Sequence, residues 1–138
     1  MDSKPRSRTV AVKVASEQEP VDCTGSFTEQ SDGFVLEFNI HNDAFTVEHK
    51  KAFTAVRAKG VMNYDIVLND AVNFTLLDTP FGQMRFEVKT LKREVVKTES
   101  AVVISLRYVM TNAAVEQLHR AVEITVAFKD TSNREEII

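Results

Sequence analysis

Apolar and polar residues alternate along most of this chain, a pattern typical of β-strands that bury one face and expose the other. The alternation is strongest in the second half, over residues 83–92, 101–110 and 119–129, where it predicts three long strands. Shorter runs with the same period occupy 9–15, 21–30, 34–41, 61–68 and 71–77. Strands with one apolar and one polar face favour an antiparallel sheet.

Residues 42–60 match two patterns. In the first pattern, apolar residues recur at the spacing of one helix face, Asn42-Asp43 could cap the start of that helix, and Gly60 could end it. In the second pattern, Phe53, Ala55 and Arg57 recur at every second position, as residues on one face of a strand do. The segments on both sides of 42–60 also have strand patterns. We therefore predict two short strands in this segment. Residues 113–118 fit either one helical turn or the start of the last strand.

The expected architecture is an all-β domain, an antiparallel meander closed into a barrel of about eight to ten strands. Closure is favoured because an open meander would expose two hydrogen-bonding edges. The sequence Thr79-Pro80-Phe81-Gly82 fits a turn that leads into one of the long strands. The 138 residues suit a single domain, expected over 9–130, with polar tails at 1–8 and 131–138.

Composition and charge narrow the expected partners and compartment. The net charge is −3 with both signs intermixed, which argues against nucleic acid and against a membrane surface as partners. The single cysteine excludes an internal disulfide. No apolar leader follows Met1, and apolar residues nowhere run for the roughly eighteen positions that a membrane helix needs. We therefore expect a cytoplasmic protein.

Three segments resemble the YwiB-like proteins, small bacterial proteins of unknown function: RAKG at 57–60, TPFGQMRFEVKT at 79–90 and HRAVEITV at 119–126. The likeness follows the chain in order over roughly residues 8–130. The region 42–51 departs from the family pattern, because it is shorter and contains no glycine. The resemblance implies a lipocalin-like, calycin-type barrel and a bacterial origin. It transfers no catalytic residue, since the family has none assigned.

Catalytic and metal-binding patterns are not found in the sequence. His41, His49 and His119 are too far apart in the pattern to converge on a metal, and we expect each at the surface. Cys23 shares its face with apolar residues, which predicts a buried and inert thiol. Phosphate loops, dinucleotide fingerprints and nucleophile elbows do not occur. We expect no cofactor, no metal and no catalytic residue.

Four polar residues share strand faces with the expected core: Arg57, Tyr64, Thr90 and Tyr108. An arginine that points into a barrel must be paired or reach solvent at the barrel mouth. One interpretation is that the four form a polar constellation in the lumen that grips an anionic ligand. The other is that Arg57 pairs with an interior carboxylate while the tyrosines cap the core.

The sequence favours a non-enzymatic domain whose lumen binds a small apolar or anionic molecule, a hypothesis that rests partly on the fold resemblance. An alternative is a protein- or RNA-interaction module that uses its outer surface, with Phe45 and Phe81 as exposed aromatics. An enzyme is the least supported class. The basic residues available to that module are Lys50, Lys51, Arg57, Lys59, Lys89, Lys92, Arg93 and Lys97.

Overall fold

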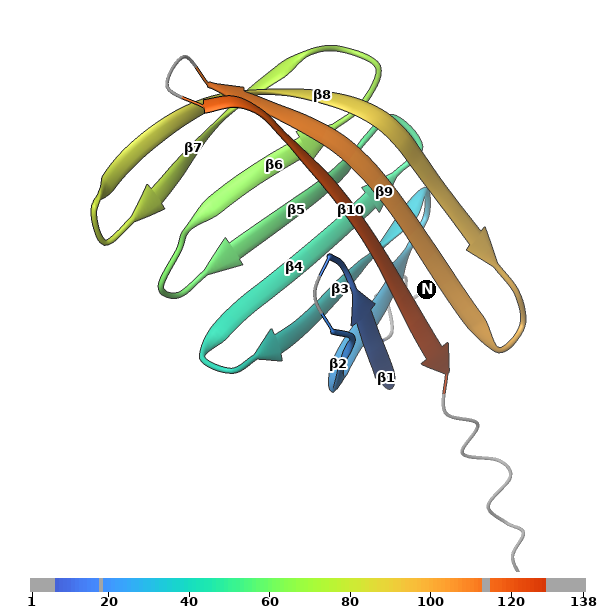
Figure 1. The fold of residues 1–138 in the computed structure, drawn as a ribbon. Helices are drawn as coiled ribbons and strands as arrows, with labels where there is room; N and C mark the ends of the chain where they lie inside the picture. The colour runs from blue at the N-terminus through green and yellow to red at the C-terminus, as the bar shows by residue number, and fades with distance from the viewer. Residues whose placement is uncertain (1–6, 18, 113–114, 129–138) are drawn as a thin grey trace, which may run out of the picture.

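The computed structural model describes residues 7–17, 19–112 and 115–128, which form one antiparallel sheet of ten strands rolled into a barrel (Figure 1). The strand order is β6-β5-β4-β3-β2-β1-β10-β9-β8-β7. Strands consecutive in sequence are paired in the sheet except β6 and β7, which form its two edges, and the first strand, β1, pairs with the last, β10. The strands are β1 (Ser7–Ala15), β2 (Val21–Gln30), β3 (Gly33–Ile40), β4 (Asp43–Lys50), β5 (Thr54–Lys59), β6 (Tyr64–Leu68), β7 (Asn73–Thr79), β8 (Gly82–Lys97), β9 (Ala101–Asn112) and β10 (Val115–Phe128).

The predicted all-β antiparallel meander is confirmed, including the two short strands β4 and β5 in the ambiguous middle segment. The last strand begins at Val115, so the described part of residues 113–118 is strand, while 113 and 114 lie outside the described residues. Ser7 and Arg8, expected in the N-terminal tail, are the first residues of β1 and pair with β2. Most of the two predicted tails lies outside the described residues. The described chain contains no helix able to cross a membrane.

One half of the barrel interior is filled by large side chains. Phe27 is fully buried, stacks on Phe34 at 4.8 Å between ring centroids and meets the edge of Phe128 at 5.1 Å. The period-two alternation of each strand sends these residues to the same face, where Leu36 and Val126 join them. Each such side chain contributes roughly 1.5–3 kcal/mol by leaving water. This half of the lumen is solid core.

The barrel is nearly closed, with a seam between β6 and β7 in place of a continuous ladder. Within the described residues, the two edges share one backbone bridge, in which Asn63 and Asp78 exchange N–H···O bonds of 2.8 and 2.9 Å. Further along, the Thr75 hydroxyl donates to the Asp65 carbonyl oxygen at 2.8 Å. The side-chain amide of Asn73 donates to the Val67 carbonyl oxygen at 3.0 Å. Side chains of β7 thus satisfy edge carbonyls of β6.

Arg93 closes the seam where β7 no longer covers β8. The ladder between these strands ends at Val88, whereas β8 continues to Lys97. The Arg93 guanidinium donates to the carbonyl oxygens of Lys50 at 3.2 Å and Lys51 at 3.0 Å, in and just after β4. This overturns our placement of Arg93 in an outer basic set. The register shifts between Thr90 and Lys92, and this bulge turns Arg93 to the inner face opposite Leu106.

Candidate functional site

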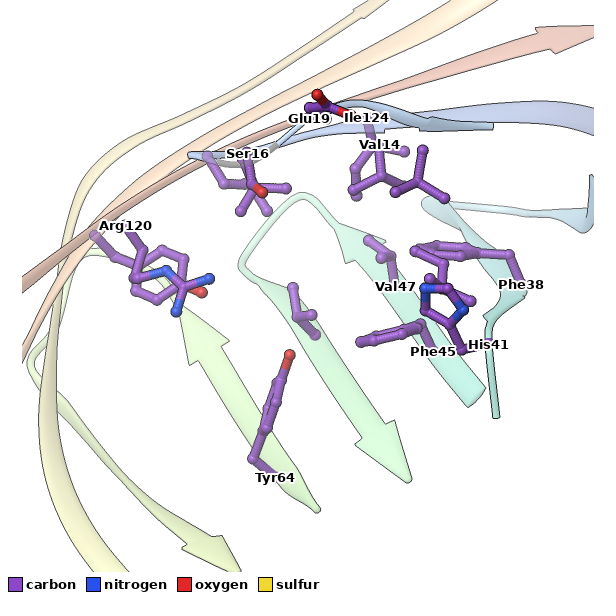
Figure 2. A pocket seen from close by; sticks show the side chains of 16 residues that line it. Val14, Ser16, Glu19, Phe38, His41, Phe45, Val47, Tyr64, Arg120 and Ile124 are labelled. Carbon is purple, nitrogen blue, oxygen red and sulfur yellow. The ribbon is translucent and has the colours of Figure 1, made fainter. Parts of the chain in front are cut away.

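The other half of the barrel interior contains a cavity of about 270 Å³ beside the β1–β2 and β3–β4 connections (Figure 2). Half of the cavity's lining residues are branched aliphatic residues, joined by two phenylalanines and two tyrosines. Phe38 and Phe45 stack at 5.5 Å with 18° between their planes and form an aromatic wall. The other apolar lining residues are Val14, Val21, Ile40, Val47, Val56, Leu106, Val122 and Ile124.

An arginine and two tyrosines line one side of this cavity. Figure 2 shows the Arg120 guanidinium and the Tyr64 hydroxyl directed into the space, across from the wall formed by Phe38 and Phe45. Tyr108 lies directly opposite Arg120 in the β9–β10 ladder, on the same inner face. Ser16 and Glu19 also line the cavity, and Figure 2 shows His41 beside Phe38 and Phe45 at the other end. The cavity therefore has one end with an arginine and two tyrosines and an opposite end with an aromatic wall.

Both tyrosine hydroxyls remain neutral at physiological pH. Burial raises the pKa of Tyr64, and burial raises the pKa of Tyr108 to about 12. The positive charge of Arg120 acts in the opposite direction and lowers the pKa of both phenols, but burial has the larger effect. Among the described residues neither hydroxyl has a hydrogen-bond partner from the protein. Both can therefore donate a hydrogen bond to a molecule in the cavity.

Glu17, in the β1–β2 connection, lies beside Arg120. The Glu17 carboxylate lies 3.6 Å from the Arg120 Nε, beyond hydrogen-bond distance, while its other oxygen accepts the Ala121 N–H at 2.8 Å. That hydrogen bond lowers the pKa of the Glu17 carboxyl, so the group stays ionised. The Arg120 Nε is buried without a hydrogen-bond partner among the described residues. The described residues therefore leave Nε–H of the guanidinium without an acceptor.

Two of the four predicted site residues line the cavity. Tyr64 and Tyr108 do so as expected. Thr90 also faces inward, opposite Tyr108 in the β8–β9 ladder, but it lies behind the cavity lining. Its hydroxyl is buried and has no hydrogen-bond partner in the described part of the chain. Arg57 is not part of this group.

Arg57 lies on the outer face of the barrel, which corrects our expectation that it points into the lumen. Its guanidinium contacts Glu48 at 3.1 Å and Asp65 at 3.2 Å, on the strands either side of β5. The expectation tied the direction of Arg57 to that of Phe53. Because β5 begins at Thr54, Phe53 precedes the strand and does not set its inner face. The inner face carries Thr54, Val56 and Ala58.

Sequence reasoning missed Arg120, although the signal was present. Arg120 is two residues from Val122 and four from Ile124, both inward, so the alternation already placed it on the inner face. The prediction named Arg57 of β5 as the inward arginine, which is wrong. The arginine that lines the cavity is Arg120 of β10.

The histidines and the cysteine have separate environments. His41 and His119 are exposed, as expected, and His41 stands at the β3–β4 turn with a positive φ of 57°. His49 is half-buried and shares a hydrogen bond of 2.8 Å with Thr54, which corrects its expected surface position. Cys23 packs against the core, and burial raises the pKa of its thiol. No cluster of three metal-ligating side chains occurs among the described residues.

The outer surface differs from the expected interaction face. Phe45 lines the cavity and is not an exposed aromatic, whereas Phe81 is 98% exposed at the tip of the β7–β8 turn. Several lysines of the expected basic set contact carboxylates: Lys50 with Asp32, Lys92 with Glu94 and Lys97 with Glu29. These pairs intersperse the two signs of charge over the outer strands.

Comparison with known proteins supports the fold. The chain is similar to the crystal structure of the YwiB protein from Bacillus subtilis, with a TM-score of 0.70. The match covers 93% of this chain and 95% of that chain at 18% sequence identity. No protein-family model and no curated protein matches the chain. The structural match confirms the resemblance to YwiB, and at this identity it concerns the fold alone.

Proposed function

We propose that this barrel is a binding domain for a small, largely apolar molecule, which occupies the cavity at the end of the lumen. The cavity itself carries this proposal. Its volume of about 270 Å³ lies just under the roughly 300–1,000 Å³ of pockets that hold drug-sized ligands, so the expected ligand is small. A mainly apolar lining with a few convergent polar groups is the usual composition of such sites.

The division of the lumen supports the same function. A barrel of this size can fill itself with side chains or hold one small ligand. Here Phe27 and Phe34 fill one half, while Val14, Val56 and Val122 leave the other half open. The solid half supplies stability, and the open half remains available for a ligand.

Titration with the neutral fluorescent ligand N-phenylnaphthylamine tests this function. We expect its fluorescence to rise on binding to the wild-type chain and this rise to be lost in Val56→Phe, which fills the cavity. Val96→Phe adds the same bulk on the exposed side of β8 and should bind as the wild type does. Circular dichroism must show that both variants are folded.

Binding that persists unchanged in folded Val56→Phe would place the ligand elsewhere and contradict the proposal, as would the absence of binding to the wild-type chain. Val122→Met is a milder filling variant from the opposite wall. It keeps the test decisive if phenylalanine at position 56 prevents folding.

A further inference from the structure

The polar end of the cavity has the chemistry of a carboxylate site. Arg120 presents a planar guanidinium whose N–H groups match the two oxygens of a carboxylate. Two neutral phenols, Tyr64 and Tyr108, stand in the same lining and can each donate one further hydrogen bond. Arg120 and Tyr108 are fixed relative to each other because their strands pair residue for residue at this point.

The part of the chain that the structure describes gives these donors no strong acceptor. The nearest carboxylate, Glu17, is 3.6 Å from the Arg120 Nε and already accepts the Ala121 amide. The two side chains are 40% and 47% exposed, so water screens their attraction, and such a pair contributes little. An anion inside the cavity would approach the guanidinium from the less hydrated side, where the attraction is stronger.

The opposite end of the cavity selects the remainder of the ligand. Phe38 and Phe45 form a stacked aromatic wall, and Figure 2 shows them across the space from Arg120 and Tyr64. Offset packing against such rings favours a planar or aromatic group. A molecule that satisfies both ends carries its charge at one end and a ring at the other.

We propose that the cavity ligand is a small monocarboxylate with an aromatic or similarly flat apolar body, its carboxylate on Arg120, Tyr64 and Tyr108. This inference rests on the proposed function and specifies the ligand class for the same cavity. Among the described residues that line the cavity, Arg120 is the one arginine or lysine, and Glu19 is acidic. A ligand with a single negative charge is therefore favoured over one with two. A dianionic phosphate would leave an uncompensated charge in an apolar site.

Isothermal titration calorimetry with two isosteric compounds, hydrocinnamate and hydrocinnamamide, tests the ligand class. The two compounds differ by one charge. The wild-type chain should bind the carboxylate about ten- to hundredfold more tightly than the amide, which corresponds to the usual contribution of hydrogen bonds to a charged group. Arg120→Gln should abolish this preference. Arg107→Gln should retain it, since Arg107 is exposed on the neighbouring strand β9.

Tyr64→Phe provides a second variant that removes a single oxygen atom. It should weaken hydrocinnamate binding severalfold and leave hydrocinnamamide binding nearly unchanged. This variant keeps the test decisive if Arg120→Gln does not fold.

The possible outcomes separate the two proposals. Equal binding of both compounds to the wild-type chain, or a preference that survives in folded Arg120→Gln, overturns the carboxylate inference. Binding of N-phenylnaphthylamine without binding of hydrocinnamate overturns the ligand class while the cavity function stands. If neither hydrocinnamate nor the neutral fluorescent ligand binds, the proposed function itself fails.

Discussion

Thr54 and His49 share a hydrogen bond of 2.8 Å at the solid end of the barrel, and Arg93 donates to the same Thr54 hydroxyl at 3.3 Å. Because an arginine can only donate, the Thr54 oxygen accepts from Arg93, and the same hydroxyl bonds the His49 Nδ1. These contacts link β8, β5 and β4 and bring the positive charge of Arg93 close to the His49 ring, where it disfavours a second positive charge.

This arrangement predicts that stability falls as the solution becomes acidic through the range of histidine titration. Burial, and then the charge of Arg93, lower the pKa of His49 below its usual 6.5. The unfolded chain then binds a proton more readily than the folded chain, so the contribution of His49 is present above pH 6.5 and is lost as pH falls through the folded-state pKa. We expect the free energy of unfolding, measured in urea, to decrease from pH 7 to pH 5.

His49→Gln removes this titration and should flatten the pH dependence over that range. His119→Gln is the matched control, because His119 is exposed on β10, and it should keep the wild-type slope. Identical slopes for wild type and His49→Gln would contradict a lowered pKa of His49 in the folded chain.

Arg93 itself is expected to be the most important polar contributor to barrel closure. Arg93→Met keeps much of the apolar stem but leaves the Lys50 and Lys51 carbonyl oxygens without their donor. We expect a loss of about 2 kcal/mol in the free energy of unfolding, since hydrogen bonds from charged groups contribute roughly 1.5–3 kcal/mol. Lys92→Met, next to it on the outer face in an exposed pair with Glu94, should cost less than about 1 kcal/mol. Equal losses for both variants would exclude a closing role for Arg93.

The direction of side chains could be predicted from the sequence wherever a strand is regular. In β10 the alternation holds from Arg120 through Val126, and it places Arg120 in the lumen without any structural information. The prediction of side-chain direction fails where a bulge adds one residue to a strand. It also fails where a strand begins at a later residue than the alternation suggests. The bulge at Leu91 turns Arg93 inward, and the start of β5 at Thr54 turns Arg57 outward. Neither event has a glycine or proline to mark it.

The cavity could not be predicted from the sequence, because its volume depends on residues of distant strands at the same height in the barrel. Val14 of β1, Val56 of β5 and Val122 of β10 surround one open space, whereas Phe27 and Phe34 meet in the solid half. In the sequence, each of these residues is an apolar residue on the inward face of a strand, so the pattern does not distinguish those around the cavity from those in the solid half. The relative height follows from strand register, which the alternation alone does not specify.

The seam between β6 and β7 should open before the rest of the barrel. Thr75 is buried, and its hydroxyl satisfies the Asp65 carbonyl oxygen in the absence of a ladder. Thr75→Val keeps the shape of the side chain but leaves that oxygen unpaired, at a cost of about 1–3 kcal/mol. Hydrogen exchange should show the amides of β6 and β7 gaining deuterium faster than those of β9 and β10.

Thr28→Val is the control for this seam variant, because the Thr28 hydroxyl bonds Ser7 in an exposed position. It should leave exchange in β6 and β7 unchanged. Uniform acceleration over all strands in Thr75→Val would show a global loss of stability and no weak seam.

The tyrosines offer a direct measurement of how dry the polar end of the cavity is. The chain contains two tyrosines and no tryptophan, so Tyr64→Phe leaves Tyr108 as the sole source of phenolate absorbance. Burial raises the pKa of Tyr108 to about 12 from the usual value near 10. The fold therefore holds the neutral phenol, and its stabilising contribution is fully present below pH 10 and is lost as pH rises from about 10 to 12. In the Tyr64→Phe chain, ultraviolet titration should show little phenolate at pH 10.5 while circular dichroism still reports the folded barrel. Half-ionisation near pH 10 in that folded chain would mean that water solvates the Tyr108 hydroxyl freely, and the polar end of the cavity would then lose the low dielectric on which a strong Arg120–carboxylate contact depends.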